Sequence, residues 1–176
     1  MSEVVCLDSN ALTYLYDSMT SKAHCPVDQL AIEKIAMLRI YLYFHTILHY
    51  SPMAKLEYQR IKTERKRVIH EQIANVLLRE IPPAESCMIE ARTNEYFCLH
   101  RKINDCRLLS ECELGGGKVL LTYDNDLLKR LRGKTQMIEL YPPSEFWARL
   151  EIPKGSSPPR TPSSSNPLSK ETWWVW

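Results

Sequence analysis

The sequence predicts an α/β fold in which a small, mostly parallel sheet lies between two layers of helices. Short apolar runs alternate with longer segments of helical spacing over the first 150 residues. Two of the runs, Val4–Leu7 and Val119–Thr122, have the length and apolar character of strands that are buried on both faces. Because strands that alternate with helices usually pair in parallel, we expect a three-layer α/β/α sandwich.

The first elements are a strand over Val4–Asp8 and a helix over Ala11–Tyr16, whose apolar residues share one face. Pro26 can open a longer helix, since proline fits the first helical turn, and apolar residues then recur at helical spacing. The stretch Tyr43–His49 mixes β-branched and aromatic residues. It is either the end of that helix or part of a second strand, which would run over Thr46–Tyr50.

The later elements follow from helical spacing and from Pro and Gly punctuation. They are a charged helix from Pro52 to about Arg79 closed by Pro82–Pro83, helices over Ser86–Arg101 and Asp105–Leu114, a stop at Gly115–Gly117, the strand Val119–Thr122, a helix over Asp124–Leu131, a strand over Met137–Leu140 and a last helix to Leu150. Residues 1–150 are therefore expected to form one domain.

Residues 151–176 differ in composition from the rest of the chain. Five prolines and six serines lie among these 26 residues, with few aliphatic side chains. Such a segment buries too little surface to offset its ordering entropy, so we expect a flexible tail. Its Trp-rich end, Trp173–Trp176, is either a disordered end or a short aromatic peptide that docks on a partner.

Composition and charge exclude several classes of protein. Lys and Arg number 23 and Asp and Glu 21, and this net charge of +2 excludes histone-like binding of nucleic acid and an acidic disordered chain. The six cysteines form no C-x-x-C pair, and their scatter suits a reducing compartment. The N-terminus lacks a signal-peptide pattern, and the most apolar stretch, Ile40–Leu48, is too short to cross a bilayer. We expect a cytoplasmic protein with no membrane contact.

Acidic side chains follow the two clearest strands at the point where each strand ends. Asp8 closes the first and Asp124 follows the other, so both are expected at the edge of a parallel sheet where ligands bind. Glu57 lies on the charged helix after the second strand, and Asp105 opens a later helix. Because Asp is a favoured N-cap, a purely capping role is the alternative for each Asp.

A divalent cation would remove the repulsion between carboxylates brought this close together. Mg²⁺ and Mn²⁺ prefer oxygen ligands and are held by a few carboxylates. Such a cation lowers the pKa of a bound water and stabilises charge on a phosphoryl oxygen. The chain has no G-x-S-x-G, P-loop or H-E-x-x-H pattern that would indicate another chemistry. The acids therefore favour metal-assisted hydrolysis of a phosphodiester.

Four segments of the chain, in order, resemble the sequence motifs of PIN domains. The segments are V-V-C-L-D-S-N-A-L, S-P-M-A-K-L-E-Y, N-D-C-R-L-L-S-E-C and K-V-L-L-T-Y-D-N-D. The resemblance covers about Val4 to Leu150 and implies a PIN-like α/β/α sandwich. It also implies a Mg²⁺- or Mn²⁺-dependent endoribonuclease whose products carry a 5′-phosphate and a 3′-hydroxyl. Many single-domain members are VapC-type toxins held inactive by a small antitoxin protein.

The resemblance implies roles for individual residues of this chain. The residues that match the catalytic and metal-binding quartet are Asp8, Glu57, Asp105 and Asp124. The residues that match supporting positions are Asn10, Thr122 and Asp126. Asp124 is preferred to Asp126 as the fourth ligand because it is nearer the strand end.

A basic run follows Glu57 on the charged helix, and it either guides RNA toward the acids or is a plain solvated face. The run consists of Arg60, Lys62, Arg65, Lys66 and Arg67. The aromatic segment Tyr41–Phe44 fits the core or a homodimer interface. A non-catalytic PIN-like module that binds RNA or protein is the alternative function, and a Mg²⁺ phosphatase, for which no D-x-D-x-T motif is present, ranks third.

Overall fold

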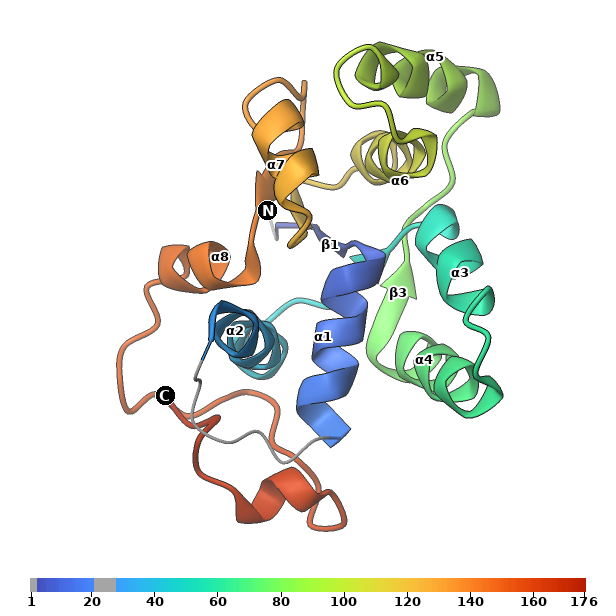
Figure 1. Cartoon of the computed structure of the whole chain (residues 1–176). Helices are drawn as coiled ribbons and strands as arrows, with labels where there is room; N and C mark the ends of the chain where they lie inside the picture. The colour runs from blue at the N-terminus through green and yellow to red at the C-terminus, as the bar shows by residue number, and fades with distance from the viewer. Residues whose placement is uncertain (1–2, 21–27) are drawn as a thin grey trace.

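A five-stranded sheet, with all neighbouring strands parallel, forms the centre of the fold (Figure 1). The computed structural model describes residues 3–20 and 28–176. The strands, in chain order, are β1 (Val5–Leu7), β2 (Leu48–Tyr50), β3 (Leu78–Glu80), β4 (Val119–Leu121) and β5 (Glu139–Tyr141). Their spatial order is β3-β2-β1-β4-β5, so β1 lies in the middle. The predicted α/β fold with a parallel sheet is confirmed.

Helices cover both sides of the sheet. They are α1 (Ser9–Thr20), α2 (Gln29–Tyr43), α3 (Pro52–Gln59), α4 (Glu64–Leu77), α5 (Ser86–Phe97), α6 (Ile103–Leu114), α7 (Asn125–Leu131), α8 (Pro143–Arg149) and the 3-10 helix η1 (Pro167–Lys170). The helices α1, α2 and α8 pack together, and α5 packs on α6. In Figure 1 the central strand β1 lies between these two groups. Within the described residues, no helix is both long and apolar enough to span a membrane.

The predicted helix from Pro52 to Arg79 is wrong as a single element. Ser51 caps α3 by accepting from the Ala54 N–H at 3.1 Å, and α3 ends at Gln59. A second helix, α4, then leads into β3, which the sequence did not indicate. Only the first residue of β3 is buried, so this edge strand gives no apolar run. Both expectations for residues 43–49 hold in part, because α2 ends at Tyr43 and β2 begins at Leu48.

Smaller differences concern the ends of the other predicted elements. The first helix is longer than its predicted bounds and includes Ser9 and Thr20. The helix predicted to end at Arg101 ends at Phe97, and the last predicted strand begins at Glu139 rather than Met137. Pro26, predicted to open the second helix, lies outside the described residues. Helix ends depend on local capping and fraying, so such shifts are expected.

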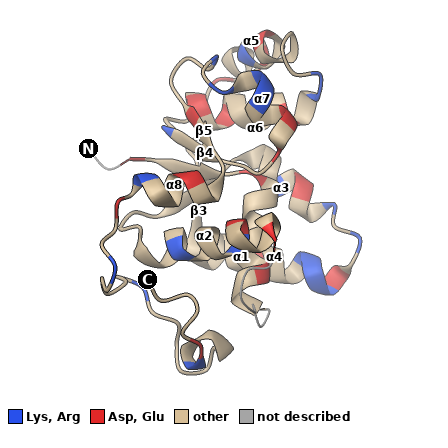
Figure 2. Cartoon of the chain, turned by 60° about the vertical axis from the view of Figure 1, so that its left-hand side comes forward, with Lys and Arg blue, Asp and Glu red and all other residues tan. Residues whose placement is uncertain are grey.

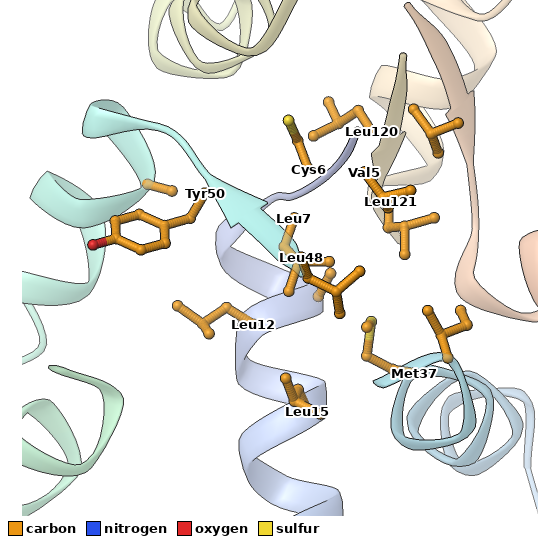
Figure 3. Close-up of a cluster of buried hydrophobic side chains, with 14 of the residues drawn as sticks. Val5, Cys6, Leu7, Leu12, Leu15, Met37, Leu48, Tyr50, Leu120 and Leu121 are labelled. Carbon is orange, nitrogen blue, oxygen red and sulfur yellow. The ribbon is translucent and has the colours of Figure 1, made fainter. Parts of the chain in front are cut away.

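The core forms where α1 and α2 cross the central strands (Figure 3). Val5, Cys6 and Leu7 of β1 are fully buried, as a strand with helices on both faces requires. Leu12 and Leu15 lie one turn apart on the buried face of α1. Burial of each such Leu stabilises the fold by about 1.5–3 kcal/mol. The packing of these two leucines on the sheet therefore holds α1 in place directly after β1.

The segment after α8 packs against α2, unlike the tail that the sequence predicted. Trp174 is buried, and its Nε1–H donates to the Leu168 carbonyl at 2.8 Å. Arg39 of α2 donates to three carbonyls of the Trp-rich end, and the Trp176 ring meets Trp147 edge to face. Composition alone missed this because a few aromatic rings supply the buried surface that aliphatic residues would otherwise provide.

Candidate active site

The ends of β1 and β4 place two polar side chains in direct contact. The strands pair in register, with Leu7 opposite Leu121, so the residues that follow them, Asp8 and Thr122, are neighbours. The Asp8 N–H donates to the Leu121 carbonyl at 3.1 Å, which continues the ladder by one residue. The buried Thr122 hydroxyl donates to Oδ2 of Asp8 and accepts from the Asp124 N–H at 3.0 Å. One hydroxyl thus holds the Asp8 carboxylate and the turn that carries Asp124.

The four predicted acids line one small pocket at this edge of the sheet. In Figure 1 the start of α1 lies close to α3, α6 and α7, which contribute the other walls. The lining residues are Asp8, Ser9, Asn10, Glu57, Asp105, Leu108, Asp124 and Leu127. The cavity volume of about 30 Å³ suits a species the size of one water molecule or one metal ion. The pocket therefore brings together carboxylates that lie up to 116 residues apart in the sequence.

Two of the three aspartates also cap helices, as the alternative interpretation expected, but Asp105 does not, because α6 begins at Ile103 with Lys102 at its N-cap. Oδ1 of Asp8 accepts from the Ala11 N–H at 2.6 Å at the start of α1. Oδ1 of Asp124 accepts from the N–H groups of Asp126 and Leu127 at 2.8 and 3.0 Å at the start of α7. Each cap uses only Oδ1, so the second oxygen of each carboxylate makes a separate interaction. Capping and a role in the pocket are therefore compatible.

Glu57, Asp105 and the second oxygen of Asp124 also have protein partners. The Ser9 hydroxyl donates to Oε2 of Glu57. Nε2 of the fully buried His100 lies 2.8 Å from Oδ2 of Asp105. The Lys102 ammonium lies 2.8 Å from Oδ2 of Asp124 and 3.7 Å from Oδ2 of Asp105. A lysine thus provides a positive charge between two of the acids.

The environment shifts the pKa values of the two strand-end acids, Asp8 and Asp124, in opposite directions. Burial raises the pKa of Asp8 to about 7; the hydrogen bonds from Thr122 and Ala11 oppose this shift, and the charges of Asp105 and Glu57 add to it. Burial also opposes ionisation of Asp124, but hydrogen bonds from Lys102 and the backbone outweigh it and hold the pKa of Asp124 below its usual value. Of these two acids, Asp8 is therefore the one that gains more from a further positive charge.

The remaining predicted residues lie around the pocket rather than in it, with one exception. Asn10 is exposed and lines the pocket. Asp126 is absent from the lining and bonds Arg130 at 2.7 Å, with His100 Nδ1 at 3.5 Å from its other oxygen. Figure 2 shows the basic run after α3 and at the start of α4. The residues of this run, none of which lines the pocket, are Arg60, Lys62, Arg65, Lys66 and Arg67.

Sequence reasoning missed three residues that contact the acids, namely Ser9, His100 and Lys102. Ser9 could have been found, since it follows Asp8 directly and a small hydroxyl there can reach a neighbouring helix. His100 and Lys102 lie in the connection between α5 and α6, and no periodicity marks them. Their roles depend on how that loop turns back toward α7.

The donor set of the pocket fits Mg²⁺ or Mn²⁺, which prefer carboxylate oxygens. The raised pKa of Asp8 is a second indication, because a nearby cation would relieve it. Within the described chain, however, no three Asp, Glu, His or Cys side chains already form a set that could hold a metal ion. The Lys102 ammonium lies against Asp124 and Asp105, so it would have to move for a cation to bind between them.

Comparisons with known proteins give a limited result. No protein-family model matches the chain, and no curated protein sequence matches it. Among solved structures, the crystal structure of FitAcB from Neisseria gonorrhoeae is similar, with a TM-score of 0.46 and 12% sequence identity. The match covers 80% of this chain and 98% of that chain. A match at this level assigns neither a family nor a function to the chain.

Proposed function

We propose that this protein is a PIN-type, metal-dependent endoribonuclease. The observation that carries the proposal is that Asp8, Glu57, Asp105 and Asp124 line one small pocket at the ends of two parallel strands. Together with the four motifs in order, this arrangement supports hydrolysis of an RNA phosphodiester more than any other chemistry. Asp124 is favoured over Asp126 because it alone of the two lines the pocket.

The four carboxylates would hold one or two Mg²⁺ or Mn²⁺ ions. When bound, such an ion lowers the pKa of a water and stabilises charge on a phosphoryl oxygen. Thr122 orients the Asp8 carboxylate, and Ser9 orients Glu57. His100 fixes one oxygen of Asp105. Each acid is thus held by a partner in the chain, but the four do not surround a common point, so side chains of the pocket, Lys102 among them, would have to rearrange for a cation to bind.

The partners follow from the same proposal. RNA is the substrate, and the exposed basic run from Arg60 to Arg67 would contact its phosphates. The resemblance to VapC-type toxins favours a small antitoxin protein as a partner, and a homodimer is a further expectation. A toxin predicts that expression of the wild type arrests growth and that Asp8→Asn relieves the arrest.

Cleavage of a labelled single-stranded RNA with Mg²⁺, Mn²⁺ or EDTA tests the proposed reaction. The wild type should cut only with metal, and Asp8→Asn and Asp124→Asn should lose activity while they remain folded. Glu145→Gln is the control, since Glu145 lies on α8, pairs with Arg132 and is absent from the pocket lining. If Asp8→Asn cleaves as fast as the wild type, or if EDTA has no effect, the proposed reaction is wrong.

A non-catalytic binding module is the second candidate, and one observation favours it. Every acid of the pocket already has a protein partner, and no three potential ligands among the described residues are gathered around a common point. In that case the acids stabilise helix ends and loops. This function predicts RNA or protein binding that is independent of metal and unchanged by Asp124→Asn, together with no cleavage by the folded wild type.

A further inference from the structure

A buried carboxylate ties the helix that carries Glu57 to the helix that carries Asp105. Glu111 of α6 is only 5% exposed, and its Oε2 accepts from the Met53 N–H at 2.7 Å. Met53 lies in the first turn of α3, where backbone N–H groups have no partner within the helix. The other oxygen of Glu111 accepts from the exposed Arg107 of its own helix at 3.1 Å. One side chain thus joins the start of α3 to α6.

The side of α6 that makes this contact also faces the acidic pocket. Asp105, Leu108 and Glu111 are spaced three residues apart, so they follow one another along one side of the helix. Asp105 and Leu108 line the pocket together with Glu57. Glu57 lies four residues after Met53, one turn further along α3. The bond from Met53 to Glu111 therefore fixes one end of the same helix contact that places Glu57 in the pocket with Asp105.

Two further contacts of α3 tie it to its own part of the chain. Ser51 caps the helix by accepting from the Ala54 N–H, and the Tyr58 ring meets Tyr50 of β2 edge to face. These contacts fix α3 after β2, but they do not set its register along α6. Burial of a carboxylate is costly unless it is hydrogen-bonded, and a negative charge is favourable at the start of a helix. Glu111 therefore holds α3 against α6 at this point.

We infer that Glu111 is a positioning residue, which sets the register of α3 against α6 and thereby holds Glu57 in the pocket as a metal ligand beside Asp105. The inference rests on the proposed nuclease function, because that function gives Glu57 a cation to bind. Glu111 is absent from the pocket lining, so it acts through α3 and not as a ligand. Its loss should therefore weaken cation binding only while Glu57 is present.

Calorimetric titration of the folded protein with Mn²⁺ tests this role without cleavage. Glu111→Leu keeps the approximate size of the side chain but removes both acceptors. It should weaken Mn²⁺ binding about tenfold, the lower end of the range for loss of a residue that orients a ligand. Added to Glu57→Gln, the same change should weaken binding less than about twofold, because the ligand through which it acts is already gone. Additive losses would show that Glu111 acts independently of Glu57 and would overturn the inference.

Two controls separate positioning from loss of charge and from loss of stability. Glu111→Gln keeps a carbonyl oxygen that can accept from Met53, so its Mn²⁺ affinity should stay within about threefold of the wild type. Glu33 is the matched residue, since this buried carboxylate accepts from the Ser144 N–H at 2.9 Å at the start of α8, a helix that contributes nothing to the pocket lining. Glu33→Leu should lose stability to urea, as Glu111→Leu does, but it should bind Mn²⁺ as the wild type does. If circular dichroism shows that Glu111→Leu is unfolded, Glu111→Asp, whose shorter side chain recedes from Met53, replaces it in the same comparison.

The outcomes distinguish this inference from the proposed reaction. If the wild type binds Mn²⁺ and cleaves RNA but folded Glu111→Leu binds Mn²⁺ equally well, the positioning role is wrong and the nuclease stands. If Glu111→Gln loses as much affinity as Glu111→Leu, charge and not helix register is responsible, and the positioning role is wrong. If the wild type binds Mn²⁺ but cuts no RNA, a loss of affinity in Glu111→Leu that depends on Glu57 keeps the positioning role in a metal-binding module without nuclease activity. If the wild type binds no Mn²⁺, both proposals are wrong.

Discussion

The hydroxyl of Thr122 donates a hydrogen bond to the Asp8 carboxylate across the ends of β4 and β1, 114 residues apart in the chain. Both side chains are buried, so water cannot replace the bond if it is lost. The same oxygen accepts from the Asp124 N–H. The structure therefore couples the position of the central acid to the turn that carries its neighbour.

Thr122→Val should destabilise the protein because it removes this hydroxyl without changing the shape of the side chain. The Asp8 oxygen and the Asp124 N–H both lose their partner, at a cost of about 1–3 kcal/mol for a buried unsatisfied group. Urea denaturation measures the change in the free energy of unfolding. Thr122→Ser keeps the hydroxyl and should recover most of the loss. Equal stability of the Val variant and the wild type would contradict the coupling.

Asp8→Asn should stabilise the metal-free protein at neutral pH. Burial raises the folded-state pKa of Asp8 to about 7, above its ordinary value of 3.8, so the folded state binds the proton more tightly than the unfolded state. Ionisation therefore costs stability as the pH rises from about 4 to 7, and the penalty is fully present above pH 7. The asparagine has no such penalty.

Urea denaturation of both proteins at pH 5 and pH 8, in EDTA, tests whether ionisation of Asp8 destabilises the wild type. The advantage of Asp8→Asn over the wild type should grow by an amount on the order of 2–3 kcal/mol between the two pH values. Asp126→Asn is the control, because the Arg130 contact lowers the pKa of Asp126 and the shift has the opposite direction. A wild type that gains stability relative to Asp8→Asn as the pH rises would show that Asp8 is not destabilised by burial.

Lys102→Met should strengthen divalent-cation binding if the proposed metal site is correct. The Lys102 ammonium lies against Asp124 and Asp105, where a metal would bind, so the two cations compete. Loss of this competing charge-assisted contact should raise the affinity for the divalent cation about tenfold. Calorimetric titration with Mn²⁺ measures the dissociation constant. Lys55→Met, which removes a similar surface pair with Glu80, should have no effect. A lower Mn²⁺ affinity in Lys102→Met would refute the competition.

Local sequence rules predicted the acids that the strands carry directly. Asp8 and Asp124 follow apolar runs, and the carboxyl ends of parallel strands must meet at one edge of the sheet. Glu57 was predicted because α3 follows β2 within a few residues. By contrast, Lys102 reaches Asp124 only through the turn between α5 and α6, and no periodic signal encodes such a turn.

Other features stayed hidden because they depend on contacts between distant residues. The edge strand β3 has one buried residue, Leu78, and therefore shows no strand pattern. The C-terminal segment has few aliphatic residues, but Arg39 binds its carbonyls across more than 130 residues of chain. Buried acids such as Glu113 look like solvated helix residues in the sequence, because their partners come from other elements.

Glu113→Gln should destabilise the fold strongly although Glu113 lies outside the acidic pocket. Its buried carboxylate accepts from the Tyr96 hydroxyl at 2.6 Å and from the N–H groups of Gln136 and Met137 at 2.9 and 2.7 Å, and it pairs with Arg92. Glutamine replaces one acceptor with a donor and leaves Arg92 without its buried counter-charge. Loss of one partner of a buried pair costs about 3–5 kcal/mol.

Glu95→Gln is the matched control for this change. Glu95 also pairs with Arg92, at 3.0 Å, but its side chain is 57% exposed. An exposed pair is worth about 0–1 kcal/mol, so the control should lose little stability. Thermal and urea denaturation of both variants give the comparison. Equal losses in the two variants would mean that burial of Glu113 does not determine its contribution.

Trp176→Ala should destabilise the protein, because the C-terminal segment is packed on the domain. The Trp176 ring meets Trp147 edge to face at 5.4 Å and lies under the Arg39 guanidinium at 4.7 Å, and its Nε1–H donates to the Ile152 carbonyl at 2.7 Å. Loss of this partly buried ring should cost about 2 kcal/mol, less than the 3–5 kcal/mol for a fully buried Trp. Val175→Ala, at an exposed neighbour, should cost under about 0.5 kcal/mol. Urea denaturation followed by tryptophan fluorescence measures both, and a Trp176→Ala variant as stable as Val175→Ala would restore the flexible tail that composition predicts.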